Sequence, residues 1–178
     1  MKSGNSEFTK LFLLESRRSI EEYHLPRLIQ CLKLLPEKDI WWRPNTASNS
    51  VGNLVLHLSG NVRQWIISGL GEGQDTRDRD REFAERGPIP RRALIGLIRG
   101  TVQEASTVLA RLSEDSLASI HDIQGFHVSG TYAVSQVAWH FAYHTGQIIF
   151  IKKWKLGKDL KFTRLPKVEQ KSVVARVP

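Results

Sequence analysis

The sequence predicts an all-α protein, a four-helix bundle. Four segments repeat apolar residues at the three- and four-residue spacing of an α-helix. They cover about residues 8–35, 48–68, 91–112 and 131–156. Within each segment the apolar positions fall on one face, as expected of helices that share a core. With 178 residues, 40% of them hydrophobic, the chain is long enough for one domain with a substantial core.

The first helical segment contains a proline. Pro26 should kink or restart the helix, because proline lacks an N–H and its ring clashes with the preceding turn. Pro36 should end it. Trp41 and Trp42 lie in the connection that follows, and we expect them to close one end of the core.

The second helix can begin at Ser48 or Ser50, since serine is a favoured N-cap. The connection after it, residues 70–88, is nineteen residues long, which exceeds a tight helix–helix turn. It therefore allows the third helix to run parallel to the second. The mixed-charge run between Asp75 and Glu82 is interpreted as a solvated loop.

The third and fourth helices are separated by an irregular stretch. Prolines just before the third helix fit a first turn. Residues 113–130 show no helical period. Apolar and polar residues alternate weakly over 123–128, which suggests a short extended piece there. We divide the chain into a bundle over 1–156 and a basic C-terminal tail over 157–178.

Charge and composition limit the function classes. The formal net charge is +8, but nine of the 26 Lys and Arg lie from Lys152 onward against two acids, so the bundle itself is almost neutral. It is therefore not a nucleic-acid-binding surface. The tail could bind phosphate non-specifically, although a solvated tail is the preferred interpretation, and nucleic acid is not an expected partner.

The sequence carries none of the common signals for export or membrane insertion. No apolar run approaches the length of a membrane span. A single cysteine, Cys31, excludes an internal disulfide and is interpreted as a core thiol. We expect a cytoplasmic protein with no membrane partner.

Three histidines are the candidate functional residues. His140 and His144 lie one helical turn apart, so both imidazoles can point to one place. They lie on the flank of the apolar stripe of the fourth helix, and His57 lies on the flank of the second. The three rings can therefore meet inside the bundle and bind one divalent metal. The alternative is a set of histidines hydrogen-bonded in half-buried helix faces. His24, His121 and His127 are interpreted as surface residues.

The chemistry of such a site follows from its ligands. Neutral imidazole binds zinc, nickel, copper or iron. Three histidines leave a fourth position open, which is typical of a catalytic metal, where water can lose a proton or a thiol can bind as thiolate. A second shell must fix each imidazole tautomer. The candidates at helical spacing are Asn53, Asn61, Tyr143 and Gln147. Nucleophile elbows, phosphate-binding glycine loops and C-x-x-C motifs are absent from the sequence.

Two stretches resemble the DinB-like (YfiT-like) metalloenzyme superfamily. Residues 49–58 (NSVGNLVLHL) and 60–66 (GNVRQWI) resemble its second helix. His140 followed by residues 144–148 (HTGQI) resembles its fourth helix. The connection WWRP at 41–44 and the stretch DRDREF at 78–83 are similar to one uncharacterised subfamily. The resemblance covers about residues 8–156.

The resemblance implies a four-helix bundle with a long crossover between helices two and three. It implies that His57, His140 and His144 are the metal ligands. Members with known activity include thiol-dependent S-transferases, a thiol-dependent isomerase and suspected metal-dependent hydrolases, and homodimers are common. The implied cofactors are a divalent metal ion, with zinc or nickel as first choice, and a low-molecular-weight thiol. The implied partner is a small-molecule substrate.

Two hypotheses follow. The first is an enzyme that activates a thiol or water on the metal, of the transferase or hydrolase class. The second is a non-enzymatic stress-response or binding module whose metal is structural or vestigial. The pocket discriminates between them: an accessible cavity at the metal, with a polar group besides the ligands, favours the enzyme. A site sealed by Trp or Phe side chains favours the module.

Overall fold

Four long helical segments form the protein, as the sequence predicts. The structure, a computed structural model, describes residues 6–71 and 73–162. The first segment joins α1 (Glu7–Arg18), the π-helical turn η1 (Ser19–His24) and α2 (Leu25–Leu34). The second joins α4 (Val51–Val62) to the π-helical turn η2 (Arg63–Ser68). The third and fourth are α6 (Arg91–Leu109) and α8 (Gly130–Leu156). Their apolar faces enclose one core, with the ring of Phe141 fully buried in it.

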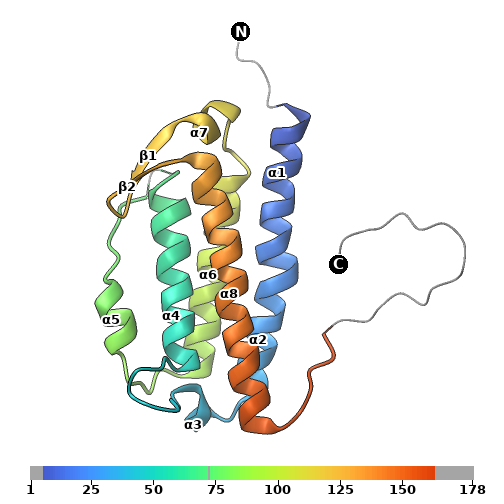
Figure 1. Ribbon diagram of the computed structural model, residues 1–178, viewed down its shortest axis with the longest axis vertical. Coiled ribbons are helices and arrows are strands. Elements are labelled where there is room, and N and C mark those ends of the chain that lie inside the picture. The colour runs from blue at the N-terminus through green and yellow to red at the C-terminus, as the bar shows by residue number, and fades with distance from the viewer. Residues whose placement is uncertain (1–5, 72, 163–178) are drawn as a thin grey trace, which may run out of the picture.

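The connectivity includes the long crossover. Figure 1 shows α4 and α6 running in the same direction, with the α1–α2 segment and α8 running the opposite way. The chain between α4 and α6 returns along the outside of the bundle and contains the short helix α5 (Arg79–Ala84), which packs against α4. The parallel orientation of the second and third helices is therefore confirmed.

Pro26 is accommodated without breaking the first segment. The π-helical turn η1 ends directly before α2, and the N–H of Leu25 bonds to the carbonyl of Ile20, five residues back. A π turn widens the helix by one residue, which gives the proline ring room where a regular turn would clash. The segment therefore continues to Leu34.

The stretch between α6 and α8 is more regular than predicted. Helix α7 (Glu114–Ala118) precedes an antiparallel hairpin of β1 (Ile120–Ile123) and β2 (Phe126–Ser129). Strand pairing runs from Ile120 opposite Ser129 to Ile123 opposite Phe126. Gln124 and Gly125 both have positive φ, as a two-residue hairpin turn requires. The prediction of an irregular segment was therefore wrong for most of this stretch, while the short extended piece expected at 123–128 overlaps both strands.

The start of α4 is fixed by local side chains. Ser50, one of the two predicted caps, accepts from the N–H of Asn53, and the Asn53 side chain accepts from the N–H of Ser50. Trp41 closes this end by packing its ring against Gly52, where a Cβ would come within 2.8 Å of three ring atoms. A smaller residue than alanine is therefore required at position 52.

Beyond α8, the described chain runs to Phe162, which packs with Leu160 against the core. Most of the predicted basic tail, residues 163–178, lies outside the described residues. Among residues 6–71 and 73–162, no helix combines the length and the hydropathy that crossing a membrane would need.

Candidate metal centre

The three predicted histidines meet between α4 and α8. His57 from α4 lies opposite His140 and His144 from α8, and one ring nitrogen of each lies within 4.8 Å of the other two. Nε2 of His57 is 3.0 Å from Nε2 of His140. The ring of His144 stands edge-on to that of His57, with centroids 4.9 Å apart. His57 and His144 are buried and His140 is half-buried.

The far side of His57 contacts a carboxylate. Nδ1 of His57 lies 3.0 Å from Oε2 of Glu82 in α5. Nη2 of Arg77, which can only donate, also lies 3.1 Å from this Nδ1. Because an ionised carboxylate can only accept, the tautomer that bonds to Glu82 carries its proton on Nδ1 and its lone pair on Nε2. Nε2 is the atom that faces His140. Glu82 therefore selects the tautomer that a metal ligand needs.

Arg77 holds the same carboxylate from the other side. Its Nε and Nη2 donate to the two oxygens of Glu82 at 2.8 and 2.9 Å. The side chains of Arg77 and Glu82 are only 3% and 10% exposed. Burial raises the pKa of Glu82, but the hydrogen bonds from His57 and Arg77 more than offset it, so this pKa lies below its usual value. Glu82 is therefore ionised at neutral pH.

These two residues correct the prediction for the charged run. The run was interpreted as a solvated loop, yet Arg77 and Glu82 lie against α4 and only their neighbours face solvent. The physical reason is Gly60 of α4, one turn after Leu56. Because this glycine has no side chain, the side chains of Arg77 and Glu82 fit against the helix there. Phe83, the next residue, packs its ring on His57 with centroids 4.6 Å apart.

His144 is fixed by Gln147, one of the predicted second-shell residues. Nδ1 of His144 lies 2.7 Å from Oε1 of Gln147, one turn along α8. Since an amide oxygen only accepts, Nδ1 is the protonated nitrogen and Nε2 bears the lone pair. Burial, then the neighbouring His144 and His57, lowers the pKa of His140 to about 3, and burial lowers the pKa of His144. Both rings are neutral at pH 7.

The other three predicted second-shell residues have different positions. Asn53 does not touch a histidine; its amide donates to the carbonyls of Glu82 and Glu85 and so holds the backbone of α5. Tyr143 packs its ring edge-on to His144, while most of its side chain is exposed. Asn61 is buried one turn after His57, and its Oδ1 has no hydrogen-bond partner among the described residues.

The arrangement fits a metal ion. Two ligands at zinc–nitrogen distances in a tetrahedral site lie about 3.3 Å apart. The 3.0 Å between two facing Nε2 atoms and the 4.8 Å limit for the whole group are close to that spacing. The Nδ1 atoms of two of the rings contact Glu82 and Gln147, which leaves the Nε2 atoms of these rings for a metal. Oδ1 of the buried Asn61, one turn after His57 on α4, has no hydrogen-bond partner among the described residues.

The remaining histidines are outside this group. Nε2 of His121 lies 2.8 Å from the carbonyl of Ser116, and His127 pairs with Asp122 at the exposed hairpin. His24 is half-buried, and burial followed by Arg27 lowers its pKa. None of the three lies near the centre formed by His57, His140 and His144.

Solved structures share this fold. A conserved protein from Enterococcus faecalis matches with a TM-score of 0.67 and 15% identity, over 82% of this chain and 97% of that one. A DinB-like protein from Bacillus subtilis matches with a TM-score of 0.60 and 18% identity, over 87% and 96%. A DinB-like protein from Bacillus cereus matches with a TM-score of 0.57 and 17% identity, over 76% and 87%. The fold is therefore DinB-like.

The sequence itself matches a family model. No curated protein matches this chain in sequence. The model of a family described as a protein of unknown function, DUF1572, matches residues 7–169, which includes all four long helices and all three histidines. The match also continues past α8 into the segment that we had separated as a tail. The chain belongs to the DUF1572 family, an uncharacterised family with the DinB-like fold.

Proposed function

We propose that this protein is a metal-dependent enzyme. In this proposal His57, His140 and His144 hold one divalent ion, and a low-molecular-weight thiol or a water is activated there for attack on a small electrophile. The observation that carries the proposal is the pairing of His57 with Glu82 and of His144 with Gln147. Groups that fix the distal nitrogens leave the proximal ones free to act as ligands.

The chain's own residues have separable roles in this proposal. A bound divalent ion would supply a Lewis acid that lowers the pKa of a thiol or water. Glu82 accepts a hydrogen bond from the Nδ1–H of His57 and thereby makes the lone pair of Nε2 a stronger metal ligand. Arg77 keeps that carboxylate ionised and in place. Phe83, packed on His57, excludes water from one side.

Two observations support an enzyme over a module with a structural metal. Among the described residues the group has three members, so a fourth protein ligand that would close the coordination shell is missing from it. None of the three histidines lines the pocket of about 590 Å³ between α8 and the start of α4, but Gln147, the polar group that bonds to His144, does. A site sealed by aromatic rings would have supported the module.

Metal content tests the proposal. Protein purified without a histidine tag and incubated with Zn²⁺ or Ni²⁺ should retain about one equivalent by elemental analysis, because three imidazoles suffice for tight binding. His57→Ala should lose the metal, and His127→Ala, which removes an exposed histidine of the hairpin, should keep it. Retention below about a tenth of an equivalent by the unaltered chain would end the proposal.

The reaction class is tested by a conjugation screen. Metal-loaded protein is offered low-molecular-weight thiols with small uncharged electrophiles, and ester or amide substrates in parallel arms. Turnover that disappears in His57→Ala and persists in His127→Ala supports the enzyme. A fully metallated protein without turnover in every arm would favour the binding module instead.

The homodimer implied by the resemblance remains a prediction. The outward face of α8 carries exposed aromatic rings, which more often mark contact surfaces than free ones. They are Trp139 and Trp154. Sedimentation equilibrium should give twice the chain mass of 20.3 kDa, and Trp154→Glu should shift it toward the monomer.

A further inference from the structure

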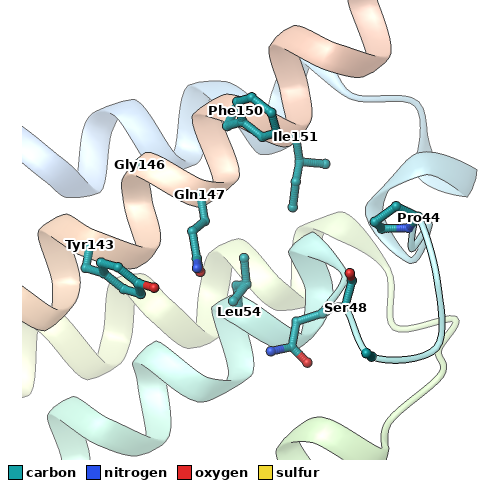
Figure 2. A pocket seen from close by; sticks show the side chains of 10 residues that line it. Pro44, Ser48, Leu54, Tyr143, Gly146, Gln147, Phe150 and Ile151 are labelled. Atoms are coloured by element: carbon teal, nitrogen blue, oxygen red, sulfur yellow. The ribbon is translucent and has the colours of Figure 1, made fainter.

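The pocket beside the metal centre lies between α8 and the connection that leads into α4. Its volume is about 590 Å³. Figure 2 shows Tyr143, Gln147 and Ile151 of α8 on one side, Leu54 at the base, and Pro44 and Ser48 on the other side. A space of this size would take a ligand of about ten to twenty heavy atoms.

The lining of this pocket is uncharged. Its side chains are apolar, hydroxyl or amide groups: Pro44, Ala47, Ser48, Asn49, Leu54, Tyr143, Gln147, Phe150 and Ile151, with Gly146 between them. The second large pocket differs, because six charged residues line it: Arg63, Arg77, Asp78, Arg81, Glu82 and Glu85. An ion placed against this lining would lose hydration without gaining a charged partner, so the lining favours an uncharged group.

The pocket is connected to a candidate metal ligand by one hydrogen bond. Gln147 lines the pocket, and its Oε1 accepts from Nδ1 of His144. The ring of Tyr143, another lining residue, stands edge-on to the ring of His144 with centroids 5.0 Å apart. A group seated here is therefore separated from His144 by one side chain, because Gln147 and Tyr143 line the pocket and His144 does not.

Gly146 is an exposed glycine at the wall of this pocket. It lies in the interior of α8, where glycine costs about 1 kcal/mol relative to alanine. No described atom lies within 4 Å of the position that its Cβ would take. Packing therefore does not require glycine here. On the same face of the helix, one turn either way, Tyr143 and Phe150 are large, so the missing side chain opens a gap in a row of aromatic rings.

We propose that this pocket binds the uncharged, apolar body of the electrophilic substrate, and that Gly146 is the residue that sets how large this body can be. The inference rests on the proposed function for the identity of its ligand as a substrate. Pocket size, neutral lining and contact with His144 through Gln147 carry it. Asn49, Ser48 and the Tyr143 hydroxyl are the lining groups that can hydrogen-bond a carbonyl or amide of that body.

A pair of fluorescent probes tests the pocket without any turnover. N-phenyl-1-naphthylamine is uncharged, and 8-anilinonaphthalene-1-sulfonate has the same rings with an added sulfonate. The positive net charge of the chain should favour the anion, whereas the neutral pocket should favour the uncharged probe. We expect saturable binding of the uncharged probe, about tenfold or more tighter than that of the sulfonate.

Gly146→Phe is the decisive variant, because its ring would project into the open space that the probe needs. Affinity for the uncharged probe should fall by about tenfold or more. Gly100→Phe is the matched control, since Gly100 also lies in a helix with no atom within 4 Å of its Cβ position. It should bind the probe as the unaltered chain does. Circular dichroism checks that both variants fold.

The outcomes separate this inference from the proposed function. Equal affinity of Gly146→Phe and the unaltered chain, or a preference for the sulfonate, would overturn the pocket assignment. An equal loss in Gly100→Phe would show that the probe binds elsewhere and would overturn it too. Metal content is measured on the same samples. If the unaltered chain binds no metal but binds the uncharged probe, and Gly146→Phe weakens that binding, the proposed function is contradicted and the pocket assignment stands.

Discussion

A methyl group at position 60 would lie 1.8 Å from Oε1 of Glu82. Gly60 of α4 therefore leaves the space that the carboxylate occupies, and the Nε of Arg77 would be 2.9 Å from the same methyl. The glycine belongs to the site although it contributes no atom to it. Its role is to let α5 approach α4 closely enough for Glu82 to reach His57.

Gly60→Ala should weaken metal binding without removing a ligand. The new methyl displaces the flexible end of Glu82, so His57 loses the acceptor for its Nδ1 proton. Loss of such a partner typically costs ~10–100-fold in metal affinity. Competition with a chelator measures the change. Gly96→Ala, at an open position of α6, is the control and should leave the affinity unchanged; equal affinities for both variants would contradict the role of Gly60.

Glu82→Gln should destabilise the fold as well as the site. It leaves the buried guanidinium of Arg77 without its ionic partner, and breaking one side of a buried pair costs ~3–5 kcal/mol. Urea unfolding of the metal-free protein measures this. Adding Arg77→Met should restore most of the lost stability while the metal affinity stays low. If the double variant regained both its stability and its metal affinity, the loss of stability alone would explain the lower metal affinity of Glu82→Gln.

Gly52→Ala should destabilise the closed end of the bundle. Its Cβ would lie 2.7 Å from the ring of Trp41, and the ring is held by a hydrogen bond from its indole nitrogen to the carbonyl of Ile89. Overpacking of this kind costs ~1–3 kcal/mol in the free energy of unfolding. Gly100→Ala should instead be neutral or stabilising, because no atom is near and alanine is the better helix former. Thermal unfolding should give a lower midpoint for Gly52→Ala and an unchanged or higher midpoint for Gly100→Ala.

Cys31 should make stability depend on pH in the alkaline range. Burial, partly opposed by Lys152, raises the pKa of its thiol from 9.0 to about 11 in the folded protein. A raised folded pKa stabilises the fold below pH 9, and that contribution is lost as the pH rises through about 11. The loss is on the order of 2 kcal/mol relative to Cys31→Ala. Urea unfolding at pH 8 and pH 10.5 compares the two chains; parallel changes would contradict the prediction.

The helical period predicted the bundle and the positions of the three histidines. His140 and His144 lie one turn apart on a helix that forms as predicted, and His57 has a matching flank position on α4. Local sequence decides these positions, because burial of one helix face fixes where its flanks point. The same reasoning placed Gln147 one turn from His144, where it does contact the ring.

Residues brought in by the crossover could not be predicted in this way. Glu82 lies 25 residues beyond His57, in a run of alternating charge whose composition is that of an exposed loop. Its burial depends on a glycine in another helix and on a guanidinium from the same run. The periodicity of the local sequence gives no indication that these residues come together. Similarly, each strand of the hairpin has four residues, too few for alternation to stand out from the surrounding sequence.

The crossover between α4 and α6 supplies the side chains that hold one of the candidate metal ligands. Arg77 and Glu82 belong to the crossover segment, residues 75–85, which runs outside the bundle, while His57, the histidine that they contact, lies in α4. If Glu82 increases the affinity for an ion, the bound ion must stabilise the packing of residues 75–85 on α4 by the same free energy. Slowed amide exchange across 75–85 would therefore indicate that the metal is bound. Substitutions in this segment could change the metal affinity while the four long helices stay unaltered.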